Sequence, residues 1–331
     1  MPITLQQAKV GMADHIDQKV IDEFRRSSLL LDNLTFDNAV SPGTGGSTLT
    51  YGYTRLKTPS TAGFRAINNE YTANEADREN IYVDLKIFGG SFEIDRVIQD
   101  TSGQINEMEF QMRQKIIGAS NLFHYTVING DSAVDSNAFD GLDKALTGSN
   151  TELNANIATD LSNDSGLESN KFAFLDLLDT FLSELDGRPS MLMGNSKLIT
   201  KIKAVARRAG YLTKSEDAFG RTVTGYDGIP LVDLGYFYNG TSTVPVVPIE
   251  SRDLDGAGSD PETTGLTDLY AVSLGMDGFH GVSPTGNSVI RTFLPDFSAP
   301  GAVKKGEVEM VGAVALKATR KAGVLRNIKV Q

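Results

Sequence analysis

The chain has 331 residues with 40% hydrophobic and 22% charged content, which suits a globular protein of two or three compact lobes. Cysteine is absent, which excludes disulfides, thiolate nucleophiles and the usual sulfur-ligated zinc sites. The net charge of −11 argues against broad wrapping of nucleic acid, because such proteins are normally basic. No apolar run reaches the length of about 18 residues that a transmembrane helix needs, and the N-terminus lacks the pattern of a secretory signal.

The charge is unevenly spread along the chain. Residues 131–186 hold twelve Asp and Glu against two Lys, whereas residues 303–331 hold seven Lys and Arg against two Glu. An acidic stretch and a basic tail attract each other, within one subunit or between subunits. Two separate solvated faces are the alternative interpretation.

Residues 1–40 are expected to form an arm with helical pieces. Its apolar residues recur at roughly helical spacing: Ile16, Val20, Ile21, Phe24, Leu29, Leu30 and Leu31. So short an amphipathic segment cannot bury its stripe alone and must lie on its own subunit or on a neighbour. A loop of Gly, Ser and Thr follows at residues 41–48.

Two strand-like runs come next, at residues 49–56 and 81–88, separated by about twenty-five polar residues. A long two-stranded excursion is only marginally stable in isolation. We therefore expect its tip to rest on another subunit.

The clearest helix follows. Caps at residues 100–102 and a stop at Asn129-Gly130 enclose one apolar face. This face is formed by Ile105, Met108, Met112, Ile116, Ala119, Phe123 and Val127. The helix is expected to span roughly 40 Å at 1.5 Å per residue, far longer than an average helix.

The second half predicts a small α/β lobe and a β-rich end. Residues 131–170 are expected to be loop-rich. Helices are expected at 169–185 and 196–208, and strands at 190–195, 229–233, 269–274, 306–318 and 324–330.

No constellation of catalytic residues is found, and we predict no catalytic, metal or cofactor site. The three histidines are scattered, the glycine loop at 43–48 lacks the lysine of a phosphate-binding loop, and residues 253–262 fit a calcium loop only loosely. The basic residues Lys201, Lys203, Arg207 and Arg208 share one predicted helix. They suit phosphates or the acidic groups of a neighbouring subunit, and the net negative charge favours the latter.

The order of these elements resembles the major capsid proteins of tailed bacteriophages, which have the α+β Hong Kong 97-type fold. The sharper matches are Met191-Leu192-Met193-Gly194-Asn195 followed by a helix, and then Gly228-Ile229-Pro230-Leu231-Val232. The resemblance implies an N-terminal arm (1–46), an extended loop (47–92), a peripheral domain (93–187) with its spine helix (100–129), an axial domain (188–290) and a return to the peripheral domain (291–331).

The resemblance also implies what such a chain does. It would be a structural protein rather than an enzyme, without cofactors, and would assemble in the host cytoplasm into the pentamers and hexamers of an icosahedral virion shell. Its implied partners are sister subunits, a separate scaffolding protein, a portal protein and double-stranded DNA held by weak non-specific contact, with no membrane. The precursor shell would later expand.

Particular residues are assigned to these roles. Candidate assembly residues are Arg25, Arg26, Lys57, Arg65, Glu70, Lys201, Lys203, Arg207 and Arg208. Candidate hinges for expansion are Gly43, Gly45, Gly46, Gly89 and Gly90. Lys57 lies in the region where some family members cross-link, but no partner residue is identified and no cross-link is predicted.

Two other functions stay open. An encapsulin-like nanocompartment would share the fold and enclose enzymes instead of DNA. A hydrolytic or sugar-binding enzyme built on the α/β lobe is the less favoured alternative, because the search for catalytic motifs finds none.

Overall fold

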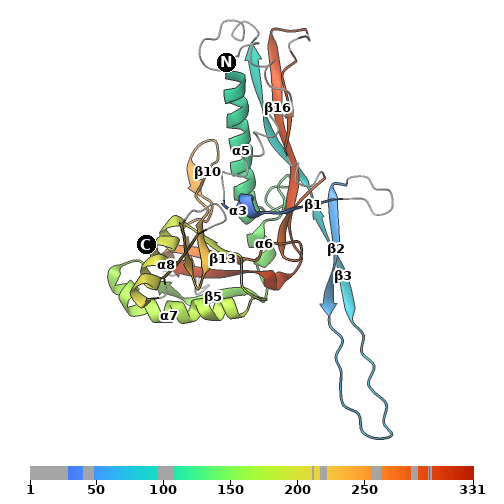
Figure 1. The fold of residues 1–331 in the computed structure, drawn as a ribbon, viewed down its shortest axis with the longest axis vertical. Coiled ribbons are helices and arrows are strands. Elements are labelled where there is room, and N and C mark those ends of the chain that lie inside the picture. The colour runs from blue at the N-terminus through green and yellow to red at the C-terminus, as the bar shows by residue number, and fades with distance from the viewer. Residues whose placement is uncertain are drawn as a thin grey trace.

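The fold consists of an α/β body, a tall layer of strands beside a long helix, and a hairpin that projects away from both (Figure 1). The computed structural model describes residues 29–39, 48–95, 107–210, 212–216, 222–254, 262–284, 290–296, 298 and 300–331. Most of the expected N-terminal arm therefore lies outside the described residues. Within them, no helix combines the length and the apolar character needed to cross a bilayer.

The projecting hairpin is formed by β2 (Thr50–Thr58) and β3 (Asp77–Asp84), which pair antiparallel from Thr50 opposite Asp84 to Thr58 opposite Asp77. The chain then leaves the hairpin at Leu85, a buried residue whose N–H donates to the carbonyl of Leu49. The next strand, β4 (Lys86–Asp95), pairs with β16 (Val303–Leu316) instead. The single strand expected at 81–88 is thus divided between two sheets.

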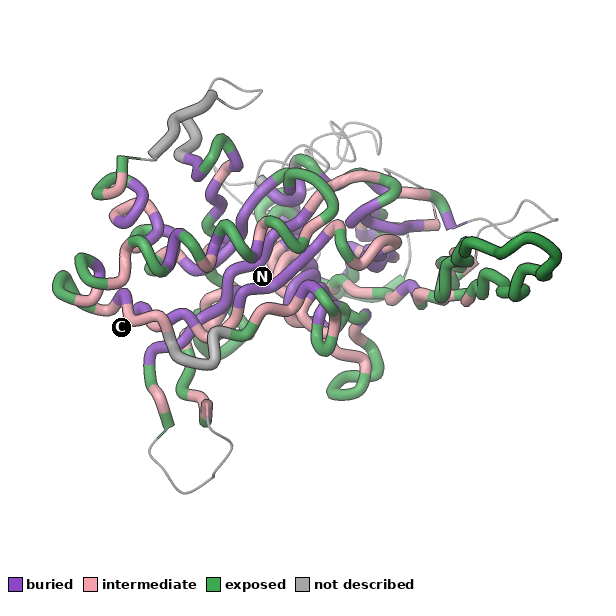
Figure 2. Tube along the Cα trace, turned by 90° about the horizontal axis from the view of Figure 1, so that it is seen from below, coloured by how far each residue is buried: buried purple, intermediate pink, exposed green. Residues whose placement is uncertain are grey.

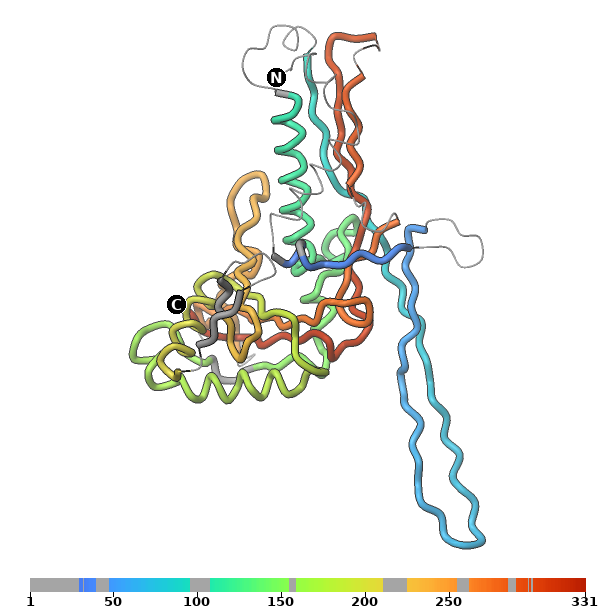
Figure 3. The backbone as a smooth tube through the Cα atoms, viewed as in Figure 1, coloured from blue at the N-terminus to red at the C-terminus, as the bar shows by residue number. Residues whose placement is uncertain are grey.

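The tall layer places the long helix against a sheet (Figure 3). Helix α5 (Glu107–Asn129) packs on β4 and β16 with the predicted stripe from Met108 to Val127, which is buried as expected. Ile105 lies outside the described residues. The same sheet also contains β14 (Phe279–Ser283), β15 (Ile290–Phe293) and β1 (Phe36–Asn38). The short helix α3 (Leu29–Asn33) precedes β1 in the chain.

Two glycines of this sheet lie beneath aromatic rings. Gly306 faces Phe92 across the β4–β16 pair, and an added Cβ would approach the ring to 2.3 Å. Gly281 faces Phe36 in the same way, and a Cβ added at Gly281 would approach the Phe36 ring to 2.5 Å. The absent side chains let the rings lie flat on the backbone, so the sheet is closely packed at both positions.

The body contains an eight-stranded sheet in the order β5-β17-β13-β6-β9-β8-β7, with β12 added to β13. Its strands are β5 (Glu152–Asp160), β6 (Met191–Gly194), β7 (Leu212–Glu216), β8 (Thr222–Tyr226), β9 (Ile229–Asp233), β12 (Glu250–Arg252), β13 (Thr263–Val272) and β17 (Ala322–Lys329). Helices α7 (Asp164–Ser183) and α8 (Ser196–Ala209) bury their apolar faces with the central strands. Smaller elements are α6 (Leu142–Leu146), β10 (Tyr236–Tyr238), β11 (Thr243–Pro245) and the 3₁₀ turn η1 (Thr319–Lys321).

Helix α8 begins and ends as its sequence predicts. The Asn195 side chain accepts a hydrogen bond from the N–H of Lys197 and also donates to the carbonyl of Val247, so one residue caps the helix and ties it to a loop. Gly210 ends the helix with a left-handed φ of 81°, which suits a residue without a Cβ. The expected range 196–208 is confirmed to within one residue.

The prediction that residues 131–170 are loop-rich was partly wrong. The segment contains α6 and the polar strand β5, and α7 begins at Asp164, five residues before the expected Ser169. Strand β5 lies at the edge of the body sheet, parallel to β17, and the backbone ladder stabilises it without an apolar alternation. Asn163 caps α7 by accepting from the N–H of Gly166.

His124 makes the stability of the fold sensitive to acid. Burial lowers the pKa of His124 on α5 to about 4, whereas an unfolded histidine takes up its proton near pH 6.5. The unfolded state therefore binds more protons between these values, and the free energy of unfolding should fall by about 2.5 kcal/mol as pH drops from 6.5 to 4. Urea unfolding across this range should show a shallower decline for His124→Gln. Parallel declines in the two proteins would contradict the assignment.

Candidate assembly surface

The outer hairpin, residues 56–78, is not covered by any other part of the chain that the structure describes. Every residue from Leu56 to Arg78 is exposed (Figure 2), and the apolar side chains of Phe64 and Ile67 at its tip are 110% and 90% accessible. A two-stranded hairpin without a core is marginally stable on its own. Large apolar side chains held this far from the body are typical of a surface that another molecule covers.

The root of the hairpin, in contrast, is held firmly. The Tyr53 hydroxyl donates to the carbonyl of Leu316 at 2.8 Å, and Arg55 donates to the carbonyls of Leu316 and Lys317 at 2.9 and 3.1 Å. These contacts join β2 to the end of β16. The root therefore fixes the direction in which the exposed tip points.

A polar cluster adds to this anchorage. The Tyr51 hydroxyl donates to Asp37 at 2.7 Å, and the Lys317 ammonium lies 3.7 Å from the same carboxylate. Although burial acts in the opposite direction, hydrogen bonds from Tyr51 and the Asn38 N–H and the charge of Lys317 keep the pKa of Asp37 below its usual value. His280 lies edge-on to Tyr51, and burial, with Lys317 nearby, lowers its pKa. Neutral His280 and ionised Asp37 are therefore the forms that the root favours near neutral pH.

Three predicted assembly residues lie on the hairpin. Lys57 faces Asp77 across the two strands at 3.7 Å, and both side chains are largely exposed. Arg65 and Glu70 lie at the tip, where the Arg65 guanidinium is 5.3 Å from the centre of the Tyr71 ring. Their contact with another subunit stays a prediction. Arg25, Arg26, Gly43, Gly45 and Gly46 lie outside the described residues.

The four basic residues Lys201, Lys203, Arg207 and Arg208 all lie on one helix, α8, as predicted. Two of them have partners in their own chain: Arg208 lies 3.0 Å from Asp164, and Lys201 donates to the carbonyl of Ser162 at 2.7 Å. Both partners lie at the start of α7, so these cations help to pack α8 on α7. Contacts of Lys203 and Arg207 with a neighbouring subunit stay a prediction.

Gly89 and Gly90 lie inside β4 rather than at a loop base, opposite Glu309 and Val308 of β16. An added Cβ at Gly89 would come within 2.0 Å of the Val308 carbonyl oxygen, whereas one at Gly90 would meet only the Lys115 side chain, at 3.2 Å. Close backbone approach therefore accounts for glycine at position 89. Hinge motion at these residues stays a prediction.

The two glycines should respond differently to alanine. Gly89→Ala should lower the free energy of unfolding by about 1–3 kcal/mol, because the backbone of β16 must move to admit the methyl group. Gly90→Ala should cost less than 1 kcal/mol, since the flexible Lys115 side chain can move aside. Urea unfolding of both variants measures the difference. Equal effects would show that the β4–β16 contact does not dictate glycine at position 89.

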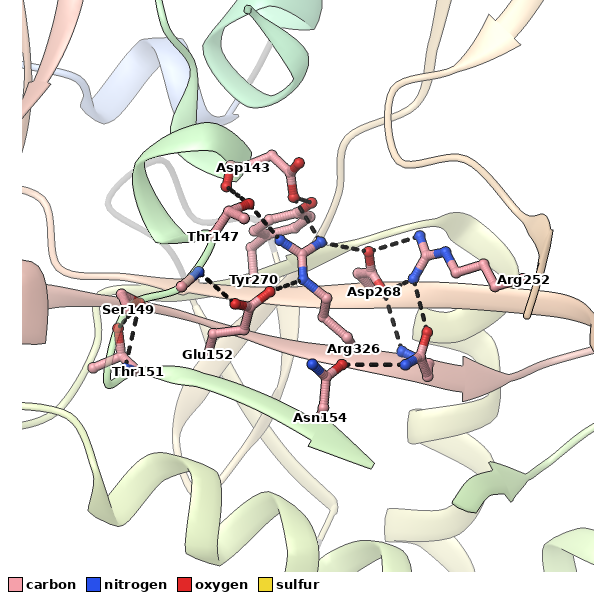
Figure 4. Close-up of polar contacts among 12 residues, drawn as sticks. Asp143, Thr147, Ser149, Thr151, Glu152, Asn154, Arg252, Asp268, Tyr270 and Arg326 are labelled. Atoms are coloured by element: carbon pink, nitrogen blue, oxygen red, sulfur yellow. Dashed lines mark hydrogen bonds and ion pairs between the residues drawn. The ribbon is translucent and has the colours of Figure 1, made fainter. Parts of the chain in front are cut away.

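A second site is a polar network inside the body (Figure 4). Its centre is Asp268 on β13, a carboxylate with only 4% of its side chain exposed. Arg252 donates to both of its oxygens at 2.6 and 2.9 Å, and Arg326 of β17 donates at 3.1 Å. The N–H of Asn327 supplies a further hydrogen bond at 3.1 Å. Asp268 thus accepts hydrogen bonds from three residues on two elements.

Arg326 extends the network to the acidic stretch of the sequence. Its guanidinium pairs with Asp143 of α6 at 2.8 Å and with Glu152 of β5. The Tyr270 hydroxyl also donates to Asp143 at 2.7 Å, and burial, followed by the charge of that carboxylate, raises the pKa of Tyr270. An open polar cavity of about 520 Å³ lies beside these residues, so water reaches one side of the network.

The attraction predicted between the acidic stretch and the basic tail is therefore present within one subunit. Lys321 pairs with Asp186 at 3.1 Å, and Lys329 pairs with Asp160 at 3.5 Å, in addition to the Arg326 contacts. These ion pairs support mutual attraction between the two segments rather than two separate solvated faces. They join β17 to α6 and to β5, and they join η1 to the loop after α7.

Comparisons with known proteins identify the fold. No model of a known protein family and no curated protein matches the sequence. Among solved structures, a chain of the holo-SrpI encapsulin complex from Synechococcus elongatus PCC 7942 is 14% identical, with a TM-score of 0.59 over 91% of this chain and 88% of that one. A chain from the capsid of the native GTA particle is 12% identical, with a TM-score of 0.56 over 90% and 89%. One from Mycobacterium phage Bobi is 12% identical, with a TM-score of 0.55 over 90% of both chains. The chain thus has the mixed α+β, Hong Kong 97-type fold of shell proteins.

Proposed function

We propose that this chain, which has the shell-protein fold, is the major structural subunit of a tailed-phage head. Its copies would form pentamers and hexamers that close into an icosahedral shell around double-stranded DNA. The observation that supports this proposal most directly is the outer hairpin, exposed from Leu56 to Arg78 yet anchored at its root by Tyr53 and Arg55. A subunit of this shape completes its packing against sister molecules.

In this proposal each structural element has its own role in the shell. The hairpin serves as the extended loop, α5 as the spine of a peripheral domain, and the part of the body around α8 as the axial domain that meets its copies around each capsomer. Such contacts are heterologous, so a repeating rotation closes rings of subunits and then a shell. Each contact must bury roughly 1,000 Å² or more to be specific, and a projecting hairpin supplies area without enlarging the core.

An encapsulin-like nanocompartment is the second candidate. The encapsulin chain has the higher TM-score of the comparisons described above, 0.59 against 0.56 and 0.55. In that case the shell would enclose protein cargo rather than a genome. The net charge of −11 gives little reason for strong contact with DNA in either shell.

The experiment that tests the proposal is expression of the full chain with its neighbouring genes, followed by electron microscopy and analysis of particle contents. A phage head predicts closed icosahedral particles with nuclease-protected DNA, and dependence on a separate scaffolding protein and a portal. Particles of one small size that hold protein cargo would instead establish the nanocompartment. A chain that stays a small oligomer under all these conditions would refute both shells.

A further inference from the structure

An aromatic pocket lies where α5 ends, and its position suggests what covers it. The cavity has a volume of about 400 Å³ and lies between α5, the start of β4 and the loop at 131–139. Its lining is aromatic: Phe88 and Phe123 stack at 5.6 Å, Phe123 and Phe139 lie 5.5 Å apart, and Tyr125 stacks on Phe237 at 4.8 Å. We call this cavity the aromatic pocket.

The rim of the aromatic pocket carries both apolar and charged side chains. Ile87 and Val134 are 60% and 86% exposed there. Asp135 carries an exposed carboxylate, which accepts a hydrogen bond from the N–H of Asn137 at 2.9 Å. Lys86 also lines the cavity, and its ammonium donates to the carbonyl of Ser136, the residue after Asp135, at 2.9 Å. Asp131 lines the cavity as well but is paired with Lys144 at 2.6 Å, so its charge is balanced within the subunit, whereas Asp135 and Lys86 contribute one negative and one positive group to the rim.

The hairpin tip carries the complementary features. Phe64 and Ile67 project into solvent, Arg65 lies between them in sequence, and Glu70 follows within the same turn. Arg65 is the only basic residue from Pro59 to Ala76. Insertion of the two apolar side chains would bring Arg65 toward Asp135 and Glu70 toward Lys86, opposite charges in both cases.

We propose that the aromatic pocket receives the hairpin tip of a second copy of this chain. A tip cannot fill the pocket of its own subunit, because the hairpin runs away from α5 and from the body (Figures 1 and 3). From Thr50 to Ile67 the extended chain spans at most about 60 Å, which is long enough to reach an adjacent subunit. The tip and the pocket are different surfaces, so the contact is heterologous and repeats from one subunit to the next. This inference rests on the proposed shell function and specifies one of its contacts.

The absence of cysteine allows a direct test. Two single-cysteine chains, Ala66→Cys at the tip and Val134→Cys at the pocket rim, are mixed, assembled and oxidised with oxidised glutathione, which accepts the two electrons released as the thiols join. Both substitutions leave Phe64 and Ile67 in place. The matched control replaces Val134→Cys by Ala173→Cys, an exposed site on α7. Non-reducing electrophoresis should show the linked dimer at least about tenfold more with Val134→Cys, because docking raises the effective concentration of the two thiols.

The outcomes separate this inference from the proposed function. Particles in micrographs without preferential linkage at position 134 would overturn the docking while leaving the shell intact. A second test uses charge: Arg65→Glu and Asp135→Arg should each raise the concentration needed for assembly several-fold, and their combination should restore it. No restoration in the combined chain, together with absent linkage, would exclude this pocket as the receptor of the tip.

Discussion

Shortening the hairpin should abolish assembly without unfolding the subunit. In this variant, residues 57–77 are replaced by Asn-Gly, which joins Leu56 to Arg78 through a two-residue turn suited to a hairpin. The removed residues are all exposed, whereas the root contacts of Tyr51, Tyr53 and Arg55 remain. Thermal unfolding should therefore occur within a few degrees of the parent, while sedimentation velocity should show only small species.

The expected loss of assembly is large because the hairpin contact would be repeated throughout the proposed shell. In the proposed shell every subunit would present the hairpin to a neighbour, so the loss would recur at each such contact and would not be confined to one site. A control with the full hairpin carries Thr54→Ala and Asn80→Ala, which removes one exposed cross-strand hydrogen bond of 2.9 Å. This control should assemble. Particles formed by the shortened chain would show that the hairpin is dispensable and would remove the main support for the proposed function.

The elements predicted well are those whose pattern is local. The stripe on α5 and the cap, stripe and final glycine of α8 are complete within a single stretch of sequence. The structure confirms α8 and, over the described residues Glu107–Asn129, the long helix, whose expected caps at 100–102 lie outside the described residues. The hairpin strands were also found, because their alternation is local. Where that pattern ends is not local: the change of partner at Leu85 depends on β16, more than two hundred residues away.

Features formed by distant residues were predicted only in outline or not at all. Charge segregation predicted attraction between the acidic stretch and the basic tail, but it did not select Arg326 and Asp143, which are 183 residues apart. Strand β5 lacks an apolar alternation and depends on β17 for its ladder. The aromatic pocket combines side chains from separate segments and has no linear signature. One signal was available and was not used, namely the lone Asp268 within the apolar strand 263–272.

That lone carboxylate leads to the second large prediction. Asp268→Asn keeps the shape of the side chain but removes its charge and turns one acceptor into a donor. Arg252 and Arg326 then face each other's charge with no buried anion between them, although Asp143 and Glu152 still neutralise Arg326. Removing one partner of a buried ion pair typically costs about 3–5 kcal/mol, and the open polar cavity beside the network places the expected loss near the lower value, about 3 kcal/mol.

The matched control is Asp160→Asn, a change of the same chemistry in the half-exposed pair with Lys329. Exposed pairs contribute about 0–1 kcal/mol, so this substitution should shift the urea midpoint only slightly. Both variants are best compared in the shortened-hairpin background, where unfolding is not coupled to assembly. Similar losses in the two proteins would mean that the Asp268 network stabilises the body no more than a surface pair does. A large loss confined to Asp268→Asn would instead identify the network as the contact that holds β13, β17 and α6 together as one unit.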